Sequence, residues 1–124
     1  MLQGKMVAPT LPAKDLDRAV AFYRDTIGLS VEEERADGVV FTAGEGTRFL
    51  VYPTDFAGTA KNTAMAFRVE DAPQEVKELK SKGVKFLEFD SGPIKTSDSI
   101  AELGGLKGAW FTDTEGNIVA VFEQ

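Results

Sequence analysis

The sequence contains no cysteine and no histidine. Without cysteine, the chain has no disulfide, no thiolate metal ligand and no cysteine nucleophile. Histidine is the commonest metal ligand in proteins and the usual general base near neutral pH, so its absence excludes serine–histidine and cysteine–histidine catalysis within the chain. These two absences restrict the possible functions more than any other property of the composition.

The chain also lacks a basic cluster and a long apolar run. Its formal net charge is -6, which disfavours nucleic acid and anionic membrane surfaces as partners. The first residues, Met1–Lys5, lack the apolar core of a signal peptide, and no stretch approaches the roughly 20 apolar residues of a membrane span. We therefore expect a cytoplasmic protein, whose acidity either provides solubility or attracts a cationic small molecule.

What is present is the composition of one ordinary folded domain. The chain has 124 residues, of which 43% are hydrophobic and 27% are charged. This length is sufficient to bury a core without disulfides, and this balance is typical of globular proteins rather than of disordered ones.

The first half of the chain predicts one strand, one helix and three further strands. An apolar run at Met6–Leu11 predicts a strand that stops at Pro12, where a backbone donor is missing. Asp15 has the properties of a helix N-cap, apolar residues follow at helical spacing, and Gly28 ends the helix. The strands predicted next are 30–35, 38–43 and 46–52, the last two joined by a turn at Gly44–Glu45.

The second half predicts the same order of elements. Thr63–Val69 predicts a strand, and Asp71 with Gln74 is similar to a capping box that begins a helix ending at Gly83. The strands predicted next are 84–89, 107–112 and 117–123, the last two forming a hairpin across 113–116.

The order β-α-β-β-β therefore occurs twice, at a spacing of roughly 55 to 60 residues. One sheet of four strands with one helix cannot bury its concave face alone. We predict an α+β fold in a single domain, residues 1–124, with one βαβββ module at about 1–57 and the other at about 58–124. The two modules should form curved mixed sheets around a central cleft, with the helices outside.

Two motifs carry a resemblance to a known family. Residues Lys14–Leu29 contain an Asp-Leu pair, a Phe-Tyr pair and a Gly-Leu end, and Phe111–Ile118 reads Phe-Thr-Asp-Thr-Glu-Gly-Asn-Ile. The first resembles the first-helix signature of the vicinal-oxygen-chelate family, which includes glyoxalases, bleomycin-resistance proteins and extradiol dioxygenases. The second is similar to that family's closing Phe-x-Asp-Pro-Asp-Gly-Asn turn, with Thr114 and Glu115 as substitutions. With the duplicated element order, the resemblance covers essentially the whole chain.

The resemblance also indicates where metal ligands would lie. In metal-using relatives, the first and last strands of each module supply four side chains that converge in the cleft. The corresponding positions here are Ala8, Leu50, Ala64 and Ala120. Divalent metals require nitrogen, oxygen or thiolate donors, and these side chains have none. The resemblance therefore implies a metal-free member without a cofactor.

Residues that share a strand face with these positions are mostly small or aromatic, which favours a roomy apolar site for a small molecule. A two-residue turn at Gly44–Glu45 would pair Phe41 with Arg48 on the inner face. Arg48 either binds an anionic or carbonyl group or extends its head to the rim, and either Trp110 or Phe111 lines the cleft. The predicted ligand-binding residues are Ala8, Phe41, Arg48, Leu50, Tyr52, Ala64, Trp110, Phe111 and Ala120.

The function implied by the resemblance is sequestration of a small organic molecule, aromatic or cationic, by a homodimer that is not an enzyme. The alternative is a metal-free enzyme, similar to a lyase or isomerase, in which Asp113, Glu45 or Tyr52 acts as acid or base, although no constellation that would perturb their pKa values is visible. Segment 90–105 is too long for a plain connector, and is either a lid over the cleft or disordered.

Overall fold

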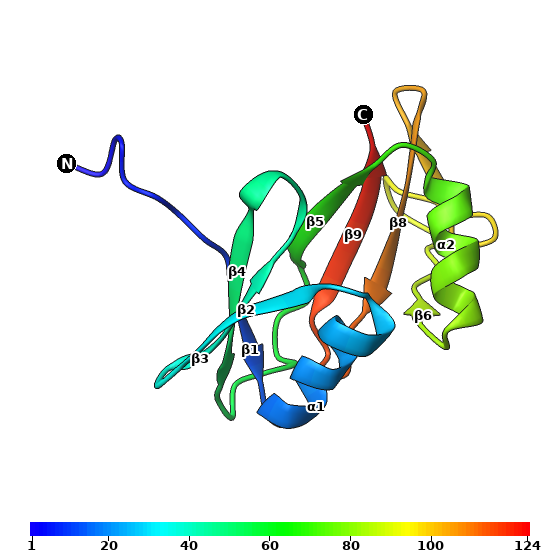
Figure 1. Ribbon diagram of the computed structural model, residues 1–124. Helices are drawn as coiled ribbons and strands as arrows, with labels where there is room; N and C mark the ends of the chain where they lie inside the picture. The colour runs from blue at the N-terminus through cyan, green and yellow to red at the C-terminus, as the bar shows by residue number, and fades with distance from the viewer.

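The computed structural model describes residues 1–124 and contains two β-sheets, each with its own helix (Figure 1). The first sheet has the strand order β1-β4-β3-β2. Its strand β1 runs parallel to β4, and the other neighbouring pairs are antiparallel. The elements of this first half are β1 (Thr10–Ala13), α1 (Leu16–Ala21), a π-helical continuation (Phe22–Thr26), β2 (Ser30–Arg35), β3 (Gly38–Thr42), a 3-10 turn (Gly44–Gly46) and β4 (Arg48–Pro53).

The second sheet has the order β5-β9-β8-β6, with β7 paired to β8. Here β5 runs parallel to β9, as β1 does to β4. Its elements are β5 (Thr63–Val69), α2 (Ala72–Ser81), β6 (Lys85–Phe86), β7 (Ala101–Leu103), β8 (Leu106–Thr112) and β9 (Ile118–Glu123). The predicted α+β fold with a repeated β-α-β-β-β order is confirmed, and β7 is an addition to it.

Both helices begin at the predicted aspartates. Each carboxylate accepts a hydrogen bond from the backbone N–H three residues on, Asp15 from Arg18 and Asp71 from Gln74, at 3.0 Å in both cases. These bonds satisfy donors that the first helical turn leaves unpaired. None of the helices combines the length and the apolar character that crossing a membrane requires.

The prediction for the first strand was wrong in its bounds. Residues 5–9 form no regular structure and are exposed, and Figure 1 shows the N-terminal segment extending away from the sheets. The strand instead contains Pro12, which β1 tolerates because it is an edge strand. Its bonds to β4 use the carbonyls of Pro9 and Ala13, so the proline nitrogen, which has no proton, faces the open side.

The packing between helices and sheets forms two apolar clusters. In the first, the ring of Tyr23 lies 5.4 Å from that of Phe49 and 5.9 Å from that of Phe41. In the second, Phe111 lies 5.6 Å from Phe86 and 6.4 Å from Phe22 of the first module. The helices therefore cover one face of each sheet, and the opposite face is not covered by a helix.

Candidate functional site

The free face of each sheet can be identified from burial along its strands. In β4, Phe49 and Val51 are buried against the first helix, so the alternating residues Arg48, Leu50 and Tyr52 point to the other side. In β5, by the same alternation, Ala64, Ala66 and Arg68 face the side opposite to Met65 and Phe67. We call this side, common to both sheets, the concave side.

An open cleft with a volume of about 1250 Å³ lies between the two sheets, and it includes Arg48, Ala66 and Arg68 of the concave side. Hydrophobic residues make up 11 of the 20 that line it, so its walls are mixed but predominantly apolar. The lining comes from segments far apart in the chain: residues 6–9, 43–49, 65–68 and 122–124, with Leu103 and Leu106. A ligand in this cleft would therefore contact both modules.

Two of the predicted site residues, Ala8 and Arg48, line this cleft. Leu50 and Tyr52 are half-buried and Ala64 is exposed; they share the concave side but lie outside the lining. Ala8 reaches the cleft as part of the extended N-terminal segment and not as a strand residue.

The placement of Phe41 in the cleft was wrong. The turn between β3 and β4 is longer than two residues, because Gly44–Gly46 form a 3-10 turn closed by the bond from Ala43 N–H to Thr47 C=O. Phe41 consequently pairs with Phe49, and Thr42 pairs with Arg48. This change of one residue moves Phe41 to the opposite face, where it is fully buried beside Tyr23.

Trp110, Phe111 and Ala120 do not line the cleft either. Trp110 does face the concave side, whereas Phe111 faces the helices. Trp110 and Ala120 are buried beneath a covering segment, residues 87–101, which packs Leu87, Phe89, Ile94 and Ala101 onto them. The ring of Trp110 lies 5.5 Å from that of Phe89 and 5.2 Å from that of Phe122.

The covering segment is held by the carboxylate of Glu88, which accepts bonds from the Ser99 N–H (3.0 Å), the Ser99 hydroxyl (2.7 Å) and the Thr96 hydroxyl (2.8 Å). These bonds lower the pKa of Glu88. The segment explains why the strand predicted at 84–89 is only two residues long: the chain leaves the sheet after Phe86 to cover Trp110. It lies over the second sheet beside the cleft, and only Leu103 and Leu106, in the hairpin that follows, reach the cleft itself.

The metal-ligand positions of the two modules can be aligned by counting residues back from the helix N-caps, Asp15 and Asp71. Thr10 pairs with Leu50 and lies five residues before Asp15, while Ala66 pairs with Ala120 and lies five residues before Asp71. Leu50 and Ala120 are therefore equivalent. Their side chains, and those of Ala8 and Ala64, carry no donor atom, and no group of three or more carboxylates in the chain is arranged to hold a metal ion. The residues do not fit a divalent metal at these positions.

Three of the four buried polar residues, Asp113, Glu115 and Asn117, lie at the junction of the modules, away from the cleft. Asp113 accepts four hydrogen bonds: from Tyr23 Oη (2.6 Å), from Asn117 Nδ2 (2.8 Å), and from the backbone N–H groups of Glu115 (2.8 Å) and Asn117 (2.9 Å). Burial, together with the Asp113 carboxylate, raises the pKa of Tyr23, which therefore remains a protonated donor. Asp113 stabilises the closing turn and is engaged at both oxygens.

Glu115, in the same turn, binds the start of the first helix. Its fully buried carboxylate accepts bonds from the backbone N–H groups of Lys14 and Asp15, both at 2.9 Å, and from Arg18 Nε at 2.8 Å. Burial alone would raise the pKa of Glu115, but the bonds from Arg18, the Asp15 backbone and Thr114 outweigh it and lower the pKa to about 2. The closing turn thus joins the two modules.

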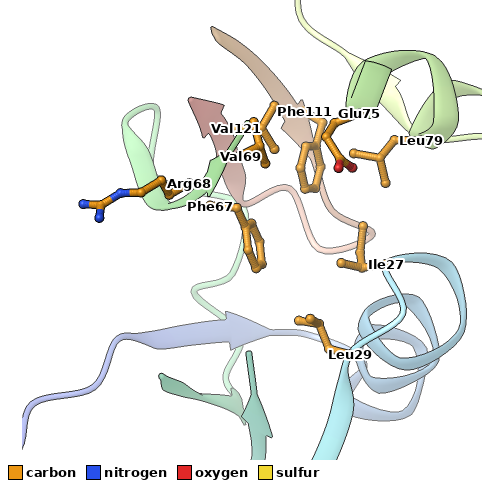
Figure 2. Close-up of a pocket in the computed structure, with 9 residues that line it drawn as sticks. All are labelled: Ile27, Leu29, Phe67, Arg68, Val69, Glu75, Leu79, Phe111 and Val121. Carbon is orange, nitrogen blue, oxygen red and sulfur yellow. The ribbon is translucent and has the colours of Figure 1, made fainter. Parts of the chain in front are cut away.

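A second, smaller pocket of about 170 Å³ lies on the helix side. Figure 2 shows Ile27, Leu29, Phe67 and Phe111 around it, while the side chain of Arg68 projects away from it. The neighbouring residues Phe67 and Arg68 therefore point to opposite faces of β5, which places Arg68 on the concave side.

The sequence was next compared with known proteins. The model of the family described as Glyoxalase/Bleomycin resistance protein/Dioxygenase superfamily matches residues 5–121. A search of curated proteins found no match.

Solved structures with this fold include a lactoylglutathione lyase from Agrobacterium tumefaciens, which is 23% identical (TM-score 0.65; 96% of this chain and 93% of that one covered). The fosfomycin resistance protein FosX from Listeria monocytogenes is 16% identical (TM-score 0.71; 96% and 92% covered). A glyoxalase/bleomycin resistance protein/dioxygenase from Alicyclobacillus acidocaldarius is also 16% identical (TM-score 0.69; 96% and 90% covered). At these identities the likeness shows the fold.

Proposed function

Because the chain belongs to the glyoxalase/bleomycin resistance protein/dioxygenase superfamily, we propose that it binds a small organic molecule in the concave cleft without the help of a metal ion. The observation that carries this proposal is an open cleft walled by both modules, beside positions Leu50, Ala64 and Ala120 that offer only hydrocarbon. A concave, largely apolar site with a few polar groups is the usual form of a small-molecule site.

Sequestration is better supported than catalysis. Of the three groups considered for acid–base chemistry, Asp113 is buried and both its oxygens are engaged, and Tyr52 lies outside the cleft lining. Glu45 lines the cleft but is exposed, and it has no neighbour within hydrogen-bond distance that would orient it as an acid or base. One FosX structure is described as complexed with Mn(II), whereas Ala8, Leu50, Ala64 and Ala120 of this chain offer no donor atom to a metal.

Thermal denaturation with added ligands tests the proposal. We expect aromatic organic compounds to raise the melting temperature by several degrees, as saturating ligand stabilises a native state by about 3 kcal/mol at a hundredfold excess over Kd. Ni²⁺, Zn²⁺ and Mn²⁺ should produce no shift that a chelator reverses. A metal-dependent shift, or the absence of any shift across a broad aromatic panel, would contradict the proposal.

A matched pair of variants locates the binding. Ala66 lines the cleft, whereas Ala64, two residues away on the same strand face, does not. Ala66→Trp should fill the cleft and abolish the ligand-induced shift, and Ala64→Trp should preserve it. Equal shifts in the two variants would mean that the compounds bind elsewhere.

We also propose that the chain forms a homodimer through its N-terminal segment. Met6 and Val7 are exposed at 86% and 95%, and Leu2 at 82%. Several exposed apolar side chains in one short segment are typical of a protein–protein interface. A second copy would cover this surface.

Sedimentation equilibrium should detect this dimer, and the double variant Met6→Ser/Val7→Ser should raise its dissociation constant at least tenfold, a change of about 1.4 kcal/mol. Phe56→Ser is the control, because Phe56 is another exposed apolar residue, at 79%, outside this segment. A monomeric wild-type protein, or a double variant that dimerises as the wild type does, would rule the interface out.

A further inference from the structure

The polar atoms left free in the cleft belong mainly to two arginines. Arg68 makes no ion pair and no hydrogen bond through its side chain, and it projects from the concave side of β5 (Figure 2). All five N–H donors of its guanidinium therefore lack a partner within the chain and are free to bind a ligand.

Arg48, on the first sheet, is oriented by an acidic neighbour. Its Nε donates to both oxygens of Glu32, at 2.8 and 2.7 Å. Its two terminal nitrogens have no partner within the chain, and the side chain is 41% exposed. The pair with Glu32 thus holds the guanidinium in place while four of its N–H donors stay available to a ligand.

One of the two acidic side chains of the cleft, Glu123, is fully engaged. Glu123 uses one oxygen to accept from the Ala72 N–H at 2.9 Å and the other to accept from the Lys107 N–H at 3.0 Å. Glu45, in the exposed 3-10 turn, also lines the cleft, and its carboxylate has no partner within the chain. Although the whole chain carries a charge of -6, the two guanidinium groups offer more unpaired polar atoms to a ligand in this cleft than the single free carboxylate of Glu45 does.

We propose that the molecule bound in the concave cleft carries an oxyanion, a carboxylate or a phosphoryl group, attached to an aromatic or other apolar body. Arg68 is its main contact and Arg48 the second, because the planar fork of a guanidinium matches two oxygens of such a group. Ala66 and Phe122, with Leu103 and Leu106, supply the apolar surface. This inference rests on the proposed function and replaces the expectation of a cationic ligand.

Four naphthalene compounds of one shape test the charge preference: 2-naphthoate, 2-naphthyl phosphate, 2-naphthalenemethanol and 2-naphthylmethylamine, measured by titration calorimetry. We expect the two anions to bind at least tenfold more tightly than the neutral alcohol, and the amine to bind most weakly. The ratio of the two anion affinities distinguishes a carboxylate from a phosphoryl ligand.

Arginine variants test which side chain binds the anionic group. Arg68→Gln should weaken 2-naphthoate binding tenfold or more and leave the affinity for the alcohol within twofold, and Arg48→Gln should have a smaller effect of the same kind. Arg35→Gln is the control, because Arg35 is an exposed arginine paired with Asp37 outside the cleft. Preferential binding of the alcohol or the amine, or unchanged naphthoate binding by Arg68→Gln, would overturn the oxyanion inference while leaving the proposed function intact. If no naphthalene compound binds at millimolar concentration, both the oxyanion inference and the proposed function fail.

Discussion

Replacing Asp113 with alanine should lower the free energy of unfolding by about 3–5 kcal/mol. The substitution removes the acceptor of four buried hydrogen bonds, which come from the Tyr23 hydroxyl, two backbone N–H groups and one N–H of the Asn117 amide, whose nitrogen still donates to the Pro12 carbonyl. Each unsatisfied buried donor costs about 1–3 kcal/mol, and partial relaxation of the turn reduces the sum. Urea denaturation at neutral pH measures the change.

Two further variants separate the contributions at Asp113. Tyr23→Phe removes only the 2.6 Å bond and should cost about 1–2 kcal/mol. Asp37→Ala removes an exposed carboxylate paired with Arg35 and should change stability by less than about 1 kcal/mol. If Asp113→Ala costs no more than Asp37→Ala, the closing turn does not stabilise the fold in the way that its bonds indicate.

Most of the fold could be predicted from the sequence because its signals are local. Asp15 and Asp71 cap their helices through bonds that span three residues, and Thr63–Val69 forms the strand that its composition predicts. The repeat of the β-α-β-β-β order then determines how the elements combine. Such signals depend on neighbouring residues alone, so a single sequence displays them.

The site was harder to predict because it depends on register and on distant segments. One extra residue in the turn at Gly44–Gly46 was enough to move Phe41 to the opposite face of its sheet. Trp110 and Ala120 lie on the predicted side of their sheet, but residues 87–101 cover them. No periodic pattern in the sequence predicts this packing. Gly104–Gly105 closes a hairpin between β7 and β8 within a segment for which only a lid or disorder was predicted, and its flanking residues Leu103 and Leu106 line the cleft.

The closing-turn motif that carries the family resemblance has a structural role. Its residues Asp113, Glu115 and Asn117 bind backbone groups and Tyr23 at the module junction and do not line the cleft. Their arrangement positions the two sheets on either side of the cleft. The residues that would distinguish one ligand from another, Arg48 and Arg68, lie outside both motifs.

Lowering the pH from 6 to 3 should cost the native state about 2 kcal/mol through Glu115 alone. Its pKa is about 2 in the folded chain and 4.5 as an ordinary glutamate, so the folded state favours the ionised form. The stabilisation is therefore complete above pH 4.5 and disappears as the pH falls through the folded pKa. Chemical denaturation at a series of pH values measures it.

Glu115→Gln isolates this contribution from those of the other carboxylates. At pH 6 the variant should be less stable than the wild type by about 2–3 kcal/mol, because the amide offers only one acceptor oxygen to four donor groups. As the pH approaches 2, the wild-type carboxyl becomes neutral as well and the difference should shrink. Glu32→Gln, which removes a half-exposed partner of Arg48, should show a much smaller change with pH. A difference for Glu115→Gln that stays constant from pH 6 to 2 would mean that its loss disrupts packing and that the ionised carboxylate is not what joins the modules.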